Sequence, residues 1–157
     1  MSKFKNARHT PSAERRVIVS LMNVFGVSHS ALTAQTSRLN VIAENLANAE
    51  VTTGDPDTAY KGKYPLFKSV LTEAQGQGDS TAMGVKFDGV VEDTRPARSS
   101  YEPGNPLADE DGFVYKSNIN SVQEMANMME ATRSYQTNVE MMNTAKQLLM
   151  RTLTLGQ

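Results

Sequence analysis

The sequence contains no cysteine and no tryptophan, and its only histidines are His9 and His29. Without cysteine the chain forms no disulfide, carries no thiol nucleophile and offers no cysteine-ligated zinc site. Both histidines lie in polar segments with no carboxylate cluster beside them, which is a poor setting for a metal site or a serine–histidine–acid triad. The composition therefore leaves little material for catalysis.

A strong charge of either sign is also missing, as is any apolar run long enough to cross a membrane as a helix. The formal net charge is −1. A nearly neutral chain has no general attraction to nucleic acid or to anionic lipid, so neither is expected as a partner.

Two short motifs resemble ligand sites but lack required residues. The acidic run 109–112 suggests a calcium loop, but Leu107 would take its first ligand position and no glutamate closes it. The glycine–lysine pair at 62–63 is no phosphate loop, because Asp57 stands where the opening glycine belongs. We therefore predict no enzymatic activity, no cofactor, no metal and no small-molecule substrate.

A long heptad pattern dominates the C-terminal segment 118–157, which we predict to be an axial helix. Ser121 and Glu124 form an S-x-x-E capping box at its start. No proline or glycine interrupts the pattern until Gly156, so the helix would be about 50 Å long. Its predicted seam alternates steps of three and four residues: Met125, Met128, Thr132, Tyr135, Val139, Met142, Lys146, Leu149 and Leu153.

Such a helix needs partners along its whole length. Burial of its apolar seam returns roughly 10–20 kcal/mol at most. Ordering its backbone costs about 1–2 kcal/mol per residue. The seam therefore indicates packing against other helices, from this chain, from other chains or from both.

A second, shorter heptad runs through the N-terminal axial helix, which we place at 22–52. Its seam comprises Phe25, Ser28, Leu32, Gln35, Leu39, Ile42, Leu46 and Ala49. A run of helix-breaking residues follows from Val51. Asn48 has two interpretations: it closes the helix in a left-handed cap, or Asn45 and Asn48 both bond the backbone of a neighbouring chain.

Residues 1–21 form a basic extension that we expect to be disordered. A basic segment before the apolar run 17–27 resembles a cleavable secretion signal, but His29 occupies the −3 position if cleavage follows Ala31. The run also continues directly into the heptad pattern. We therefore favour the opening of the first helix over a signal peptide.

The middle of the chain, 53–117, reads as a small β-rich insert with a mobile glycine-rich loop at 75–81. Tyr64 to Phe67 suggests an edge strand because it contains Pro65. Asp88 and Gly89 between two apolar runs predict a two-residue hairpin turn. The expected fold is α+β, with two long terminal α-helices packing as a coiled-coil-like hairpin around this insert.

Five segments together resemble the bacterial flagellar basal-body rod proteins, most closely the proximal rod proteins of the C type. The Asn-Leu-Ala-Asn run at 45–48 is weak by itself, but the five segments in this order are highly specific. They are Ala31–Gln35, Glu44–Ala49, Tyr101–Asp109, Arg133–Glu140 and Thr152–Gln157.

The resemblance implies a structural subunit of the proximal rod, self-assembling through its terminal helices into the tubular drive shaft. It implies export without a cleaved signal and a location in the basal body, where the rod crosses the periplasm. Expected partners are other rod proteins and further copies, together with the adaptor to the export gate and the membrane ring. The expected assembly interface is Leu32, Leu39, Ile42, Asn45, Leu46, Asn48, Met125, Met128, Tyr135, Val139, Met142, Leu149 and Leu153.

Two alternatives fit the same helices. The chain could be a periplasmic or secreted coiled-coil adaptor for one partner helix, which would form a folded oligomer of fixed size. It could also be a cleaved periplasmic binding protein, whose mature N-terminus would lie near Leu32.

Overall fold

The computed structural model describes residues 13–73 and 81–155, and within them all side chains except those of 13–22, 72–73, 81–82, 153 and 155. Most of the basic extension lies outside the described residues, as does the loop expected at 75–81 except for Thr81, which begins a strand. The described chain is α+β, as expected. Its elements are α1 (Ala13–Asn48), β1 (Thr52–Thr53), β2 (Lys63–Glu73), β3 (Thr81–Glu92), β4 (Arg98–Tyr101), β5 (Phe113–Lys116) and α2 (Ser121–Leu155).

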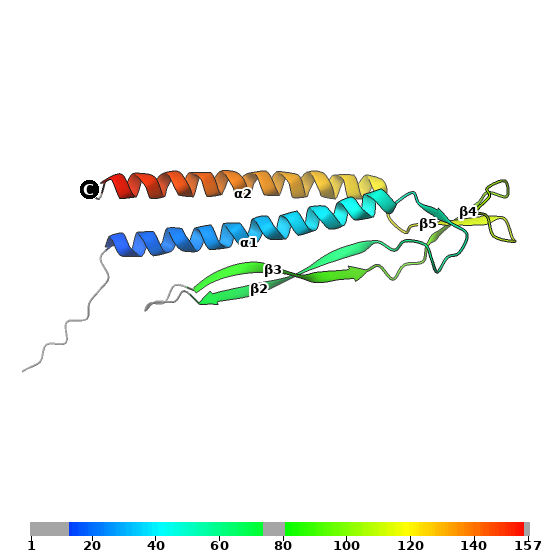
Figure 1. Ribbon diagram of the computed structural model, residues 1–157, viewed down its shortest axis with the longest axis horizontal. Coiled ribbons are helices and arrows are strands. Elements are labelled where there is room, and N and C mark those ends of the chain that lie inside the picture. The colour runs from blue at the N-terminus through cyan, green and yellow to red at the C-terminus, as the bar shows by residue number, and fades with distance from the viewer. Residues whose placement is uncertain (1–12, 74–80, 156–157) are drawn as a thin grey trace, which may run out of the picture.

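The two helices are antiparallel neighbours that contact each other, and together they give the molecule its elongated shape (Figure 1). α1 begins at Ala13, so the expected helix start at residue 22 is wrong. The reason lies in the sequence: between Pro11 and Gly26 no residue breaks a helix, and the apolar run from Val17 extends the pattern backwards. Neither described helix is both long enough and apolar enough to cross a bilayer.

Strands β2 and β3 form a long antiparallel ribbon, paired from Lys63 with Glu92 to Glu73 with Thr81. The predicted hairpin turn at Asp88 and Gly89 is wrong, because both residues lie within β3. The register shifts there, since Leu66 pairs with Gly89 and Phe67 with Phe87. Gly89 has φ of 128°, a backbone angle that suits a β-bulge as well as a turn.

The ribbon lies beside α1 (Figure 1). Hydrogen bonds join it to α1 at two points on opposite edges. Near the far end of the ribbon, the Ser30 hydroxyl accepts a hydrogen bond from the backbone N–H of Val85 in β3, at 3.1 Å. At the base, Asn45 bonds the backbone of Lys63 in β2. The edge that meets α1 therefore changes from β3 to β2, as the strong twist of a two-stranded ribbon allows.

A three-stranded sheet of order β1-β5-β4 closes the end of the molecule where α1 ends and α2 begins. Tyr101 and Phe113 pair across β4 and β5 with their rings edge to face, at a centroid distance of 5.3 Å. Gly112 turns the chain into β5 with φ of 82°. The sheet thus joins the ribbon to the start of α2.

The core of the described chain is thin and made mostly of small side chains. Val114, Asn45 and Ser117 are its largest fully buried side chains. Many larger apolar side chains stay exposed, and on the ribbon these include Leu66, Leu71, Met83 and Val91. A fold with so little internal burial has much apolar surface left for partners.

Candidate assembly interface

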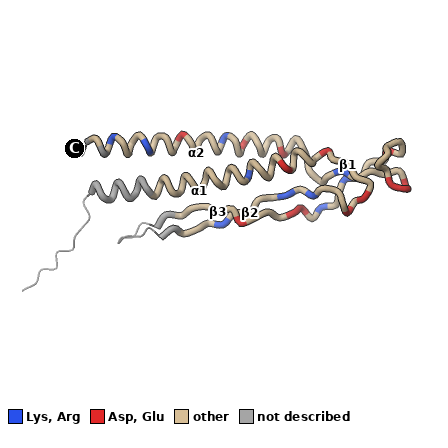
Figure 2. Tube along the Cα trace, in the orientation of Figure 1, with Lys and Arg blue, Asp and Glu red and all other residues tan. Residues whose placement is uncertain are grey.

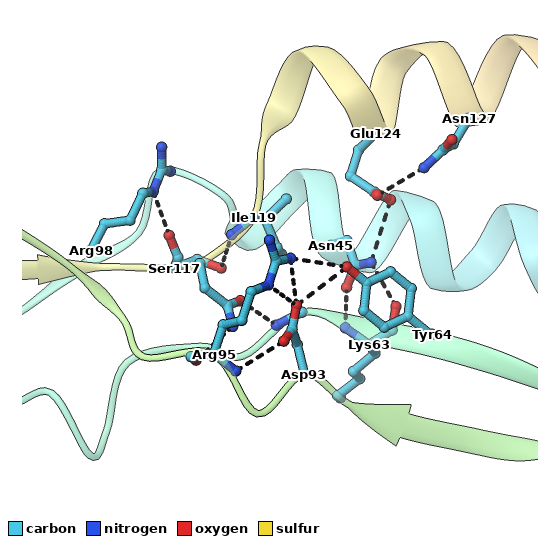
Figure 3. Close-up of polar contacts among 12 residues, drawn as sticks. Asn45, Lys63, Tyr64, Asp93, Arg95, Arg98, Ser117, Ile119, Glu124 and Asn127 are labelled. Carbon is cyan, nitrogen blue, oxygen red and sulfur yellow. Dashed lines mark hydrogen bonds and ion pairs between the residues drawn. The ribbon is translucent and has the colours of Figure 1, made fainter.

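Asn45, near the end of α1, is the centre of a polar junction that joins the helices to the ribbon (Figure 3). Its carboxamide oxygen accepts hydrogen bonds from the backbone N–H of Lys63 at 2.9 Å and from the hydroxyl of Tyr60 at 3.2 Å. Its amide nitrogen donates to the Lys63 carbonyl at 2.8 Å and to Glu124 at 3.4 Å. The side chain is 2% exposed, and its hydrogen-bonding capacity is used within the subunit.

The start of α2 is capped by Asn120 and not by the predicted box of Ser121 and Glu124. The Asn120 side-chain oxygen accepts from the backbone N–H groups of Val122 at 3.0 Å and Gln123 at 3.2 Å. Glu124 instead points inward, where it is 6% exposed and accepts from Asn45 and from Asn127. Asparagine is as good a cap as serine, so the glutamate is free to link the two helices.

A second asparagine, Asn118, fixes the two strands at the base of the ribbon. Its oxygen accepts from the Gly62 N–H and its nitrogen donates to the Arg95 carbonyl, both at 2.9 Å. The Arg95 guanidinium in turn bonds Asp93 and Tyr64. Its hydrogen bonds lower the pKa of the Asp93 carboxyl to about 2.

A small cleft of about 140 Å³ opens beside this junction, between the start of α2 and the ribbon. Asn45, Arg95 and Glu124 contribute polar groups to it, and these are bonded to protein partners. Within the described ranges, no three His, Cys, Asp or Glu side chains are grouped so as to hold a metal ion. The polar groups of this junction therefore hold the helices and the ribbon together.

α2 carries a buried stripe, the inner stripe, on the side that faces α1. Among the described elements α2 contacts α1 alone, so α1 covers the residues that α2 buries. Ala131 is 0% exposed, and Ala145 and Glu124 are each 6% exposed, while the other members are half-buried apart from Tyr135 at 37%. The stripe comprises Glu124, Met128, Ala131, Tyr135, Asn138, Met142, Ala145, Leu149 and Thr152.

A second stripe, the outer stripe, follows the same alternating spacing on an adjoining face of α2. It comprises Val122, Met125, Met129, Thr132, Gln136, Val139, Asn143, Lys146 and Met150. Val122 is 70% exposed, Met129 69%, Met150 57% and Met125 47%, and Val139 is half-buried. Among the described elements only α1 contacts α2, so the exposed apolar members of this stripe are left uncovered. The outer stripe is the principal candidate for contact with another subunit.

The predicted α2 seam straddles these two stripes. Met128, Tyr135, Met142 and Leu149 belong to the inner stripe, whereas Met125 and Val139 belong to the outer one. Thr132 and Lys146, also counted in the seam, are exposed. The side chain of Leu153 lies outside the described residues.

The α1 residues of the predicted interface are all at least half-buried within the subunit. Ile42 is 4% exposed and Asn45 2%, so their assignment to a contact between subunits is not kept. Leu32, Leu39 and Leu46 are half-buried. The Asn48 amide donates to the Glu44 carbonyl one turn earlier, at 2.8 Å, and so stays within its own helix.

Sequence reasoning missed the buried alanines Ala131 and Ala145 and the inward orientation of Glu124. The signal was present: Glu124, Ala131 and Ala145 are multiples of seven residues apart, one position before the chosen seam. Small residues on one face permit close helix–helix approach, while large apolar residues on the next face remain for other contacts.

Two family models match this chain, one at each end. Residues 25–54 match the model described as flagella basal body rod protein. Residues 110–155 match the model described as flagellar basal body rod FlgEFG protein C-terminal. These ranges contain most of α1 and α2, the helices that carry the polar junction and both stripes. The matches define a flagellar basal-body rod protein.

Individual relatives narrow this class. The flagellar basal-body rod protein FlgC of Salmonella typhimurium is 46% identical over 139 residues, covering 88% of this chain and 100% of the relative. FlgC of Escherichia coli O157:H7 is 47% identical and FlgC of Yersinia enterocolitica 44%, with the same coverage. The chain therefore belongs to the FlgC family of flagellar basal-body rod proteins.

Family membership confirms the expected class of function. The chain is a structural subunit of the flagellar basal-body rod and not an enzyme, because its relatives are named as rod proteins. The basal body is accordingly its location, and rod proteins are the class of partner that its family implies.

Proposed function

We propose that this chain is a subunit of the proximal rod and that it joins its neighbours through the outer stripe of α2. The observation that carries the proposal is the exposure of Val122, Met125, Met129 and Met150 along one face of a helix. A rod subunit needs an exposed apolar surface on its long helices. The outer stripe supplies one, concentrated in the first turns of α2 and continued at Val139 and Met150.

Covering the outer stripe is energetically favourable. Full burial of one large apolar side chain contributes about 1.5–3 kcal/mol, so covering a side chain that is half to two-thirds exposed contributes on the order of 1 kcal/mol. Several such residues in each subunit sum to a useful association energy. The stripe also has few charges that would oppose burial, because Lys146 is its only charged member.

The N-terminal half of α1 supports a role in a subunit–subunit contact. From Val17 to Ser37 its sequence contains no lysine, arginine, aspartate or glutamate. Figure 2 draws the described part of this segment, 23–37, in tan. Within this segment Val24 and Val27 are each 37% exposed. A long uncharged helix face in water is unusual for a surface helix, and it fits a helix that is covered by neighbouring subunits.

Charge insertion into the outer stripe tests the proposal. In a strain that lacks the chromosomal gene, Met129→Asp and Val139→Asp should each abolish swimming, although the variant proteins are still made and secreted. A buried carboxylate without a partner is costly, so the subunit would not be retained in the rod. Swimming halos and mass spectrometry of isolated basal bodies measure the result.

Thr137→Asp is the matched control, because Thr137 is exposed on α2 away from both stripes. This variant receives the same new charge in the same helix and should swim normally. If Met129→Asp and Val139→Asp also swim normally, the outer stripe is not an assembly surface.

We further propose that the subunit is exported without a cleaved signal and contacts copies of itself, other rod proteins, the adaptor to the export gate and the membrane ring. The resemblance of the chain to proximal rod proteins supports these assignments. Site-specific photo-cross-linking from Met125 and Met150, followed by mass spectrometry, would identify the neighbours. An N-terminal peptide that begins near Leu32 in basal bodies would contradict uncleaved export.

A further inference from the structure

The exposed large residues of α2 are unusually rich in methionine. Four methionines of this helix are 47–69% exposed: Met125, Met129, Met141 and Met150. Three of these, Met125, Met129 and Met150, belong to the outer stripe. Met128 and Met142 belong to the inner stripe and are half-buried. Three of the four accessible thioethers thus share the outer stripe, with Met141 apart from them, whereas the shielded pair lies on the inner stripe.

Methionine and leucine pack in similar ways, but only methionine carries a sulfur atom that can be oxidised. Its sulfur reacts with a peroxide: the sulfur lone pair attacks one peroxide oxygen, the O–O bond breaks and an S–O bond forms. The sulfur is oxidised by two electrons, and the other oxygen leaves as hydroxide. This hydroxide takes the proton of the sulfur-bound hydroxyl, which gives water and the sulfoxide. The product is a sulfoxide, a polar group with strong hydrogen-bond acceptor character.

We propose that Met125, Met129 and Met150 form an oxidation-sensitive site whose conversion to sulfoxide prevents the subunit from entering the rod. The inference rests on the proposed function, because it requires the outer stripe to be buried on assembly. Burial of a sulfoxide without a hydrogen-bond donor carries a desolvation cost that the thioether does not have. Subunits that are already assembled are protected, since assembly covers the stripe.

The first test measures site selectivity on the purified full-length protein. After limited exposure to hydrogen peroxide, peptide mass spectrometry should find sulfoxide at Met129 and Met150 several-fold sooner than at Met128 and Met142. Met83 provides a reference outside the helices, since it is 62% exposed on the ribbon. Equal oxidation rates at the inner and outer methionines would overturn the assignment of the site.

The second test asks whether polarity alone blocks assembly. Glutamine resembles methionine sulfoxide in size and polarity, so Met125→Gln/Met129→Gln/Met150→Gln should reduce the number of basal bodies per cell at least several-fold. The triple leucine variant should assemble normally, and its formation of new basal bodies should resist a sublethal peroxide pulse that inhibits the wild type. Met83→Gln is the matched control and should swim normally.

The outcomes separate this inference from the proposed function. If Met129→Asp blocks assembly but the triple glutamine variant assembles normally, the outer stripe is the interface and oxidation sensitivity is wrong. If both variants assemble normally, the proposed interface itself is wrong. Equal inhibition of the leucine variant and the wild type by peroxide would also overturn the inference.

Discussion

The side chain of Asn45 forms hydrogen bonds with both backbone groups of Lys63, accepting from its N–H at 2.9 Å and donating to its carbonyl at 2.8 Å. A carboxamide can replace one residue of a neighbouring strand in this way, because it presents one acceptor and one donor side by side. The end of α1 thereby supplies hydrogen-bond partners for the backbone N–H and carbonyl of Lys63, the first residue of β2. The same side chain reaches Glu124 of α2, so one residue sets the positions of three elements.

Asn45→Ala should destabilise the folded subunit by about 2–4 kcal/mol, because several buried polar groups lose their partner. Urea unfolding, followed by circular dichroism, measures this loss. Asn48→Ala is the matched control three residues later. Its amide bonds only its own helix, at Glu44, so we expect a loss of less than about 1 kcal/mol. Equal destabilisation by the two variants would contradict the role given to Asn45.

Ala131→Leu tests the phase of the inner stripe. Ala131 is 0% exposed, so extra methylene groups there would push α2 away from α1. Overpacking of this kind costs about 1–3 kcal/mol. Ala126→Leu makes the same change at an exposed position of the same helix and should be nearly neutral. If the two variants have the same free energy of unfolding, the buried face of α2 has been assigned wrongly.

The two helices and their approximate lengths can be predicted from the sequence, because heptad spacing and helix-breaking residues are local signals. Every residue of the α1 seam described here, from Phe25 to Ala49, is buried or half-buried as expected. The α2 seam was placed on the large residues, although close packing selects small ones such as Ala131. Hydrophobicity alone does not distinguish a face covered within the subunit from a face left for a partner.

Long-range contacts explain the remaining differences. Asp88 and Gly89 carry the chemistry of a tight turn, but the extended pairing of β2 and β3 uses them as a bulge. Glu124 fits a local capping box, yet it turns toward Asn45 on the other helix. In both cases a contact distant in sequence replaces the local option, and a single sequence contains no direct signal for such contacts.

Gly112→Ala should destabilise the β4–β5 turn by about 1–2 kcal/mol, because Gly112 has φ of 82°. A Cβ atom at this position would also lie 3.0 Å from the ring of Tyr101 and 3.2 Å from Pro103. Gly104→Ala is the control in the same loop, where an added Cβ meets nothing within 4 Å. Amide hydrogen exchange at Phe113 and Tyr115 should accelerate in Gly112→Ala only.

The Asp93–Arg95 pair predicts a specific pH dependence. The pKa of the Asp93 carboxyl is lowered to about 2, first by the side-chain hydrogen bond from Arg95. The folded state thus favours the carboxylate. Its contribution to stability is complete above the ordinary aspartate pKa of about 3.9 and is lost as the pH falls toward 2.

Carbon-detected NMR titration measures this pKa directly. Arg95→Gln should raise the pKa of Asp93 toward its ordinary value. Arg98→Gln should leave it unchanged, because Arg98 donates to the Ser117 carbonyl instead. Titration of Asp93 near the ordinary aspartate value in the wild type would rule out the ion pair in solution.

A version of the protein that begins at Met22 should restore swimming to a strain lacking the gene. The matches to the FlgC relatives span 100% of each relative but only 88% of this chain. Residues 1–21 also contribute no position to either predicted seam, so their loss should remove little packing.

The basic charge of the segment provides the physical alternative, since Arg8, Arg15 and Arg16 could hold an acidic partner. Full-length protein with these three arginines changed to glutamine separates the two cases. If the shortened and the neutralised proteins both fail at matched protein levels, the charge of the segment is required; if only the shortened protein fails, its helical length is required.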